Sequence, residues 1–471
     1  YFIEPGEVAG DADQEAEEID LDYIRPDLAK LQRRDALLRD EQRPDAVAKR
    51  RKTGQRTARE NVAAICDADS FIEYGAAQRA RRSLDDLIQN TPADGLITGI
   101  GSVNGDLFGE DRSHCAVLAY DYTVLAGTQG TMNHKKTDRI LDIAEQQKLP
   151  VIFFAEGGGG RPGDTDNATK VAGLDGPSFL QYARLSGLVP RIAVVSGRCF
   201  AGNAVFAGCS DLMIATENAC IGMAGPAMIE GGGLGSFKPE EVGPVSVQRA
   251  NGVIDCVVKD EEEGAALAKK LMGYFQGEIT DWTCEDQRWL RRAVPENRLH
   301  AYDMRHLINV FADTDSVVEL RPDFAPGMIT AFVRVEGRPL GLIANDPKVL
   351  AGAIDAAGAD KASRFMQLCD AFGVPMVSFC DTPGFMVGPE EEETAMVRHT
   401  CRMFVTAASL TVPLFSLVTR KGYGLGAQGM TGGSFHAPFF CASWPSGEFG
   451  GMGLEGAVNL AYKKELDAQE T

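Results

Sequence analysis

One long segment occurs twice in this chain, and this repeat constrains the fold more than any other feature. Residues 361–388 repeat residues 136–163 without a gap, at a constant offset (361 − 136 = 225). The same offset aligns residues 124–127 with 349–352, both of which read Val-Leu-Ala-Gly. The aligned positions include Lys136 with Lys361, Phe154 with Phe379, and Gly159 with Gly384. Matches of this length at one offset predict two similar halves rather than a solenoid of short repeats.

Each copy of the repeat ends where an apolar run breaks into a turn of small residues. Residues 151–155 are apolar and lead into Gly157 to Gly160, and the second copy leads from 375–380 into Asp381-Thr382-Pro383-Gly384-Phe385. Glycine admits positive φ and close approach of a ligand, and a nearby helix start leaves amide N–H groups unpaired. This pattern favours an oxyanion hole. A flexible linker is the alternative, but it would not follow so apolar a strand.

Helices and strands alternate along both halves, which predicts an α/β fold. Helices are expected over 27–41, 46–66, 135–148, 178–188, 261–275, 304–311 and 361–372, and strands over 151–155, 191–196, 328–335, 340–344, 375–380 and 412–419. A second small-residue turn follows a strand in each half, at 197–205 and 420–427. We expect an acidic leader with a first helix (1–45), an amino-terminal half (46–298) and a carboxy-terminal half (299–471).

The composition excludes several classes of partner. Lys and Arg number 47 against 67 Asp and Glu, a net charge of −20, which argues against nucleic acid or an anionic membrane. The 11 cysteines are scattered without Cys-x-x-Cys spacing, so neither a disulfide framework nor a zinc site is expected, and a cytoplasmic location fits. No apolar run approaches the roughly 20 residues of a membrane helix. The first residue is Tyr1 rather than Met, which suggests a piece of a longer polypeptide.

The segment Lys49 to Arg59 is strongly basic in this acidic chain. It is either a solvated helix face or subunit contact, or a clamp for ligand phosphates. The run Gly424 to Gly429 fits G-x-G-x-x-G, but a dinucleotide site needs a complete βαβ unit and the chain is nearly over. The six histidines show no metal-ligand spacing, and no Gly-x-Ser-x-Gly or P-loop is present. Amide-rich turns without a nucleophile point to chemistry carried by a cofactor or by the substrate.

Four motifs resemble the carboxyltransferase subunit or domain of biotin-dependent acyl-CoA carboxylases. They are Asp-Thr-Pro-Gly-Phe-Met-Val-Gly (381–388), Arg-Lys-Gly-Tyr-Gly-Leu-Gly (420–426), Gly-Arg-Cys-Phe-Ala-Gly (197–202) and Phe-Val-Arg-Val-Glu-Gly-Arg-Pro (332–339). The resemblance covers about Thr57 to Lys464. It implies two tandem crotonase-like domains, an active site between the amino half of one subunit and the carboxy half of another, and a homo-oligomer, usually a hexamer.

The resemblance also implies site residues. The amides of Gly158 and Gly159 would hold the acyl thioester oxygen, and those of Leu425 and Gly426 would face the biotin ureido oxygen. The implied acyl-CoA contacts are Arg56, Arg59, Gly160, Arg161, Phe200, Ala201 and Gly202. The implied biotin contacts are Pro383, Gly384, Phe385, Tyr423 and Gly424. Gly157 and Gly160 replace the commoner Ser and Ala, and Leu425 replaces a small residue, so the acyl group stays open.

The implied reaction transfers a carboxyl group from carboxybiotin to the α or vinylogous carbon of an acyl-CoA, through enolates held by fixed amides and without a metal. The chain lacks an Ala-Met-Lys-Met biotinylation motif and an ATP-binding module, so the carrier and biotin carboxylase would lie on other domains or subunits. The alternatives are a biotin-linked decarboxylase or transcarboxylase, a crotonase-type hydratase or hydrolase, and a scaffold without activity.

Overall fold

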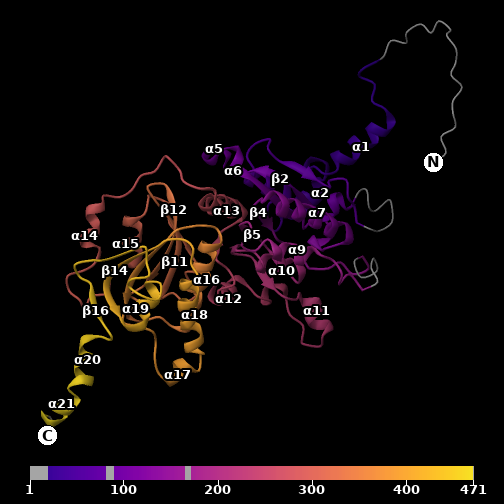
Figure 1. Ribbon diagram of the computed structural model, residues 1–471. Coiled ribbons are helices and arrows are strands. Elements are labelled where there is room, and N and C mark those ends of the chain that lie inside the picture. The colour runs from indigo at the N-terminus through magenta and orange to yellow at the C-terminus, as the bar shows by residue number, and fades with distance from the viewer. Residues whose placement is uncertain (1–19, 81–89, 165–170, 470–471) are drawn as a thin grey trace, which may run out of the picture.

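The computed structural model describes residues 20–80, 90–164 and 171–469, which form two α/β halves side by side (Figure 1). The first half contains a seven-stranded sheet in the order β1-β2-β3-β4-β5-β7-β9. The strands are β1 (Ile72–Tyr74), β2 (Leu96–Ser102), β3 (His114–Tyr120), β4 (Val151–Phe154), β5 (Arg191–Val195), β7 (Leu212–Thr216) and β9 (Cys256–Val258). A separate pair joins β6 (Arg198–Phe200) to β8 (Cys220–Gly222).

The helices of this half connect and cover its strands. They are α1 (Pro26–Ala36), α2 (Pro44–Arg51), α3 (Ala58–Ile65), α5 (Gly105–Phe108), α6 (Glu110–Ser113), α7 (Thr131–Gln147), α9 (Ser178–Arg184), α10 (Gly202–Gly208), α11 (Pro226–Gly231), α12 (Val245–Ala250) and α13 (Glu261–Gln276). Short α14 (Leu290–Ala293) lies in the connection to the second half.

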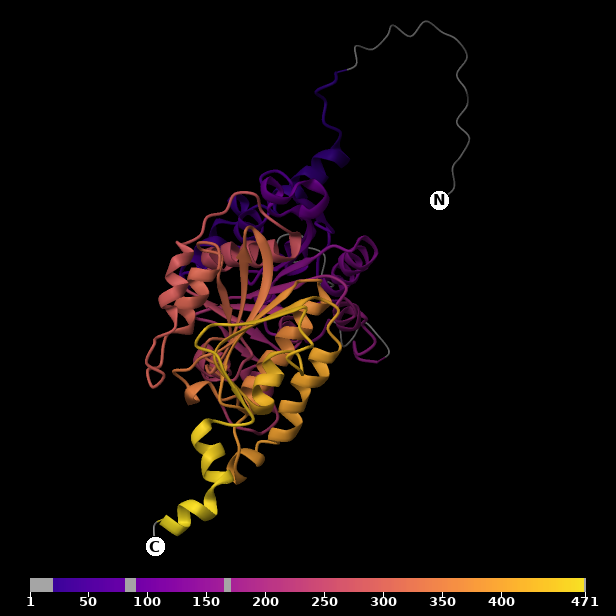
Figure 2. The same cartoon turned by 60° about the vertical axis from the view of Figure 1, so that its left-hand side comes forward.

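The second half contains a sheet in the order β10-β11-β12-β13-β14-β15, with β16 also paired to β14. The strands are β10 (Val318–Leu320), β11 (Met328–Val335), β12 (Arg338–Asn345), β13 (Met376–Thr382), β14 (Leu414–Tyr423), β15 (Phe440–Ser443) and β16 (Glu448–Gly450). The helices are α15 (Met304–Phe311), α16 (Ala356–Ala371), α17 (Pro389–Glu392), α18 (Met396–Ala408), α19 (Gly424–Met430), α20 (Leu454–Ala461) and α21 (Lys463–Gln469). In both views α20 and α21, drawn in yellow, extend away from the rest of the chain (Figures 1 and 2).

The two sheets share one pattern of strand directions. In each, the first three strands pair antiparallel and the next strands pair parallel. Helices α7 and α16 begin at Thr131 and Ala356, again 225 residues apart (356 − 131). The amide of Gln129 donates to the carbonyl of Gly159 at 2.7 Å, as the amide of Ile354 does to Gly384 at 3.1 Å. Gly159 and Gly384 therefore occupy equivalent places, as the offset predicts.

One hydrophobic core joins the halves through helix α13. Its Tyr274 stacks on Phe332 of β11 with ring centroids 5.3 Å apart, and its Phe275 packs edge-on against Phe372. The same buried cluster includes residues of α3, β3 and β5 from the first half and of α16 and β13 from the second. Aromatic pairs of this kind add about 0.5–1.5 kcal/mol beyond their buried area, so these contacts stabilise the packing of the two halves.

Most expected elements are confirmed, α15 and β11 with the expected bounds. The single helix expected over 46–66 is wrong, because α2 ends at Arg51 and α3 begins at Ala58. Gly54 takes φ +73°, and Thr57 caps α3 in a reciprocal capping box with Glu60. Among the described residues, no helix combines the length and apolar character that crossing a membrane requires.

Candidate active site

The turn after β4 brings a bare stretch of backbone to the sheet edge. Gly157 has φ +140°, and a Cβ there would lie 2.1 Å from the carbonyl oxygen of Gly127. Only glycine fits this close approach. Gly158 is exposed, and its amide has no acceptor among the residues that the structure describes. The first turn therefore offers the Gly158 amide to a ligand.

Gly159 does not offer its amide in the same way. Its N–H donates to Oδ1 of Asn203 at 2.8 Å, and Nδ2 of Asn203 donates to the carbonyls of Glu156 at 2.9 Å and Gly127 at 3.3 Å. The expected role of the Gly159 amide as a donor to a substrate oxygen stays a prediction, and in this structure a buried side chain accepts that hydrogen bond. Asn203 instead fixes the shape of the turn.

The second turn of the first half faces this glycine turn. Ala201 has φ +51° and precedes α10, whose first amides, those of Gly202 and Asn203, have no acceptor in the described part of the chain. A Cβ on Gly159 would come 2.5 Å from Cβ of Ala201. The glycine turn and the start of α10 thus border one small region, where the expected acyl-CoA contacts Phe200, Ala201 and Gly202 lie.

The second half repeats this arrangement between β13 and α19. Gly384 follows β13 with φ +134°, and a Cβ on Gly426 would come 2.6 Å from its carbonyl carbon. The amides of Leu425 and Gly426 lie in the first turn of α19, and no described residue accepts from them. The side chain of Leu425 is 63% exposed. The structure therefore brings Gly384, Leu425 and Gly426 together with two free donors.

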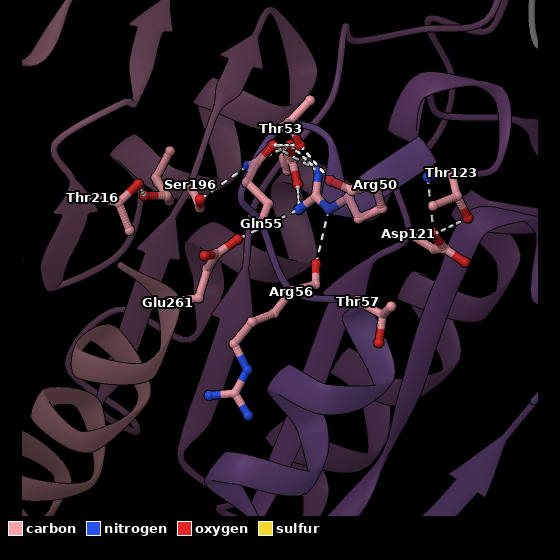
Figure 3. A network of polar contacts seen from close by, with 12 residues as sticks. Arg50, Thr53, Gln55, Arg56, Thr57, Asp121, Thr123, Ser196, Thr216 and Glu261 are labelled. Atoms are coloured by element: carbon pink, nitrogen blue, oxygen red, sulfur yellow. Dashed lines mark hydrogen bonds and ion pairs between the residues drawn. The ribbon is translucent and has the colours of Figure 1, made fainter. Parts of the chain in front are cut away.

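A buried ion pair between Arg50 and Glu156 lies next to the first turn. Nη1 and Nη2 of Arg50 donate to the two carboxylate oxygens of Glu156 at 2.8 and 2.6 Å, and Gln55 donates to Oε1 at 3.2 Å. Figure 3 shows how Arg50 also reaches the backbone of Arg56 and lies close to Glu261. Burial raises the pKa of Glu156, although Arg50 acts in the opposite direction. Because Glu156 directly precedes Gly157, this pair anchors the glycine turn.

Asp381 plays the same part in the second half. It lies 225 residues after Glu156 and is fully buried, with Nη2 of Arg420 at 3.2 Å and Nζ of Lys421 at 3.3 Å. The Arg420 guanidinium stacks over the ring of Tyr302 at 5.0 Å. The two halves thus place a paired carboxylate immediately before each turn.

Tyr423, which is expected to contact biotin, is held by β16. Its hydroxyl donates to Oε2 of Glu448 at 2.6 Å, and Arg298 pairs with the other oxygen of that carboxylate. Burial and the Glu448 bond raise the pKa of Tyr423 to about 12. Phe385 packs against Phe404, with ring centroids 6.2 Å apart. These contacts hold Tyr423, which directly precedes α19, and Phe385, which lies against Gly429 of α19.

Arg161 is not an exposed ligand contact. Its guanidinium is 3% exposed and bonds to Asp94 at 2.8 Å, to Asp164 at 2.9 Å and to the carbonyl of Thr128 at 3.0 Å. The expected acyl-CoA contact at Arg161 stays a prediction, and the donors of its side chain bond to groups inside the protein. Arg161 positions the end of the glycine turn, and Gly160 beside it is exposed.

The two expected phosphate contacts differ in availability. Arg59 bonds to both carboxylate oxygens of Glu73, at 3.0 and 3.3 Å, and to the carbonyl of Leu38. Arg56 lies 3.7 Å from an oxygen of the exposed Glu262 and is 27% exposed. Arg56 is thus the freer of the two. No group of three or more His, Cys, Asp or Glu in the described ranges is arranged to hold a metal ion.

Sequence reasoning missed Asn203, Gln55 and the partners of Glu156 and Arg161. A signal existed for one of them, because Glu156 aligns with Asp381 in the repeat and two acids at buried strand ends need cationic partners. Nothing in the sequence connects Asn203 to Gly159.

The chain is similar to several known proteins. The family model described as carboxyl transferase domain matches residues 49–471. A single-chain, multi-domain long-chain acyl-CoA carboxylase of known structure is 57% identical, with a TM-score of 0.91 over 93% of this chain, which spans 44% of that chain's length. The hexameric transcarboxylase 12S, solved with methylmalonyl-CoA, is 30% identical with a TM-score of 0.82 over 94% of this chain and 86% of its own. The methylmalonyl-CoA decarboxylase subunit alpha of Veillonella parvula is 32% identical over 89% of this chain and 83% of its own. The chain therefore belongs to the carboxyl transferase domain family.

Proposed function

We propose that this chain carries out the carboxyl-transfer step of a biotin-dependent acyl-CoA carboxylase. One observation carries the proposal: in each half a buried strand ends in a glycine turn that faces the start of a helix with unpaired amides. In the first half the turn contains Gly158 and the helix start contains Gly202. In the second half the turn contains Gly384 and the helix start contains Leu425. Two sets of fixed donors suit a reaction in which negative charge builds on one oxygen of each of two substrates.

The first site would stabilise the enolate of the acyl-CoA thioester. Since Asn203 accepts the Gly159 proton, we assign the donors to the amides of Gly158 and Gly202. The second site supports the Gly202 part of this assignment by position, because Leu425 corresponds to Gly202 at the offset of the second turn (425 − 202 = 223). Gly158 has no such counterpart, because the residue 225 positions later is Pro383, which lacks an N–H. The amide of Gly202 at the start of α10 is therefore equivalent to that of Leu425, the second residue of α19.

The second site fits a planar ureido group. The amides of Leu425 and Gly426 are free, and position 426 leaves no room for a side chain beside Gly384. Biotin, carried by another domain or subunit, supplies the carboxyl group when bound. This chain's part is to hold the ureido oxygen at those amides, and Tyr423, tied to Glu448, borders the site.

The shared strand pattern and offsets support an origin of both halves by duplication of one crotonase-like unit, with bounds near 46–298 and 299–471. We also propose a homo-oligomer, a hexamer in analogy with transcarboxylase 12S, whose active sites join the first half of one copy to the second half of another. Exposed apolar side chains on the second half favour such an interface. They include Phe439, Phe440, Phe449, Leu454 and Leu460. The unpaired cysteines of the described residues fit a cytoplasmic location.

The alternative is a decarboxylase or transcarboxylase built on the same subunit, which the Veillonella relative favours. The test mixes the purified chain with free biotin and a series of 2-carboxyacyl-CoA thioesters of increasing chain length. We expect biotin-dependent release of the decarboxylated acyl-CoA, and the preferred length identifies the acyl group. Release that does not depend on biotin, or hydration of an enoyl-CoA instead, would overturn the proposal. Net carboxylation by the reconstituted complex with ATP and bicarbonate separates carboxylase from decarboxylase.

A further inference from the structure

A cavity of about 380 Å³ lies where the two halves meet. The first half lines it with residues of α5 and α13, and the second half with the loop 313–316 and with Arg334 of β11. Residues 279–283 of the connection between the halves complete the wall. None of the described lining residues belongs to a glycine turn, so this cavity is separate from the two sites described above. Small-molecule sites typically measure about 300–1,000 Å³, a range that includes this cavity.

The motif Phe-Val-Arg-Val-Glu-Gly-Arg-Pro (332–339), to which the carboxyl-transfer reaction assigns no role, builds one wall of the cavity. The carboxylate of Asp313 accepts from the amides of Glu336 at 2.9 Å and Gly337 at 2.7 Å, which fixes the turn of this motif. Gly337 has φ +76°, and a Cβ there would lie 1.9 Å from the carbonyl oxygen of Ile279. The turn is therefore packed directly against the connection between the halves.

Arg334 is a buried cation without a carboxylate partner. It is 6% exposed, and its guanidinium lies over the rings of Tyr274 at 5.0 Å and Phe108 at 5.9 Å. Its Nη1 and Nη2 donate to three backbone carbonyls at 2.7–2.8 Å, those of Gly273, Gly277 and Gly337. A guanidinium has five N–H donors, so two of them have no acceptor among the described residues. No ion pair in the described ranges involves Arg334.

Lys270 brings a second uncompensated cation to the cavity. Its Nζ donates to the carbonyl of Asp315 at 2.5 Å, and no ion pair of the described chain includes it. The carboxylates of Asp281 and Asp315 also line the cavity, but both residues are exposed, whereas Arg334 is buried. Water and salt screen exposed charges much more than buried ones. The buried guanidinium therefore favours an anion more than the exposed acids oppose it.

Aromatic side chains supply the remaining surface of the cavity. Phe108, Tyr274 and Trp282 line it, and Trp282 is 39% exposed. Aromatic rings stack well against other flat groups, and an indole offers a large apolar face. The cavity thus combines cationic donors with flat apolar surface.

We propose that this cavity binds a small molecule that consists of a flat, apolar body and a single carboxylate. The free donors of Arg334 and Lys270 would hold the carboxylate, because charge-assisted hydrogen bonds to an ion are about twice as strong as neutral ones. The rings of Phe108 and Trp282 would contact the body. Asp281 and Asp315 disfavour a dianion such as a phosphate ester. Because the lining comes from both halves, the ligand would bridge them, and its binding does not depend on the carboxyl-transfer reaction.

The test measures binding of 2-naphthoate, the uncharged 2-naphthamide and phenyl phosphate to the full chain by titration calorimetry. We expect 2-naphthoate to bind at least about tenfold more tightly than either of the other two, because only it carries a single negative charge. Equal affinity for the acid and the amide overturns the role of the cations. Tighter binding of phenyl phosphate overturns the monocarboxylate assignment.

Two variants locate the binding site. Trp282→Ala removes apolar surface and Lys270→Gln removes a cation, and each should weaken 2-naphthoate binding about tenfold. The matched controls are Trp289→Ala, which is 55% exposed and does not line this cavity, and the exposed Lys259→Gln. Both controls should bind as the wild type does. Weakening of equal size in variants and controls would mean an adventitious additive only, and unchanged affinity in both variants overturns the proposal.

A second measurement covers the case in which a variant folds poorly. A ligand that binds only the folded chain raises its melting temperature. Saturating 2-naphthoate should raise Tm in the wild type and in both controls, and much less in Lys270→Gln, whose exposed side chain is not part of the core. An equal rise in Tm for Lys270→Gln and Lys259→Gln would contradict the assignment.

Discussion

The side-chain oxygen of Asn203 accepts a hydrogen bond 2.8 Å long from the amide of Gly159. At the corresponding place in the second half stands Gly426, which has no side chain and lies against Gly384. The two halves therefore build similar turns by different means. In the first half, the side chain of Asn203 connects the turn to the start of α10. In the second half, the backbone of the turn lies directly against the start of α19.

Replacing Asn203 with alanine should destabilise the first half. The change leaves the Gly159 amide and the carbonyls of Gly127 and Glu156 without their partner in a buried place. Leaving a buried polar group unpaired costs about 1–3 kcal/mol. Urea denaturation should show a fall of this size or more in the free energy of unfolding. Asn251→Ala, at an exposed position, serves as the control, and equal stability of the two variants would contradict the role of Asn203.

Local patterns predicted the strands, the turns and their repeat. The apolar run at 151–155 and the glycines after it depend on neighbouring residues alone, and β4 and its turn lie where expected. The partner of Glu156 was not predictable from the sequence, because Arg50 lies 106 residues away. An arginine in a basic segment is equally consistent with an exposed position on the protein surface. The break between α2 and α3 was readable, since Thr57 and Glu60 have capping-box spacing, but the run of basic residues suggested one helix. Sequence distance hid the partner of Glu156, whereas the break between α2 and α3 was missed although its signal is local.

Arg50→Met should lower the thermal stability of the protein more than a substitution of the same kind at the surface. It would leave Glu156 buried without its cation, and breaking a buried pair costs about 3–5 kcal/mol. Arg51→Met removes an arginine whose side chain is 47% exposed and paired with Glu60, where the loss is about 0–1 kcal/mol. Thermal unfolding monitored by circular dichroism compares the two. A melting temperature lowered equally by both would show that the Arg50 pair does not anchor the turn.

Lys136 should make stability depend on pH. Burial lowers its pKa to about 7, while its amino group donates to the carbonyls of Ala93 and Leu96. In the unfolded chain a lysine keeps its proton up to about pH 10.4. Between these values the unfolded state binds more protons, so the free energy of unfolding should rise with pH from about 7 to about 10.

Lys136→Met removes this contribution, and urea denaturation at several pH values should show a flatter rise than in the wild type. The neighbouring exposed Lys135→Met should keep the wild-type slope. A slope that is the same in all three proteins would mean that Lys136 does not titrate in this range.

Leu425→Pro tests the donor assigned to the biotin side. Proline has no N–H, but it is tolerated in the first turn of a helix, where Leu425 lies. Losing one preorganised donor typically lowers the rate about 10²–10³-fold. We therefore expect kcat for biotin-dependent carboxyl transfer to fall by that factor. Leu425→Ala keeps the amide and removes only a side chain that is 63% exposed, so it should retain most of the activity.

The comparison also separates a chemical effect from a packing effect. Both variants must keep the oligomer size and thermal stability of the wild type, which size-exclusion chromatography and calorimetry establish. If Leu425→Pro is folded and transfers carboxyl groups as fast as Leu425→Ala, the amide of Leu425 does not stabilise developing charge. The free donors at the start of α19 would then serve to position the carrier's prosthetic group, and KM for free biotin rather than kcat should change in the proline variant.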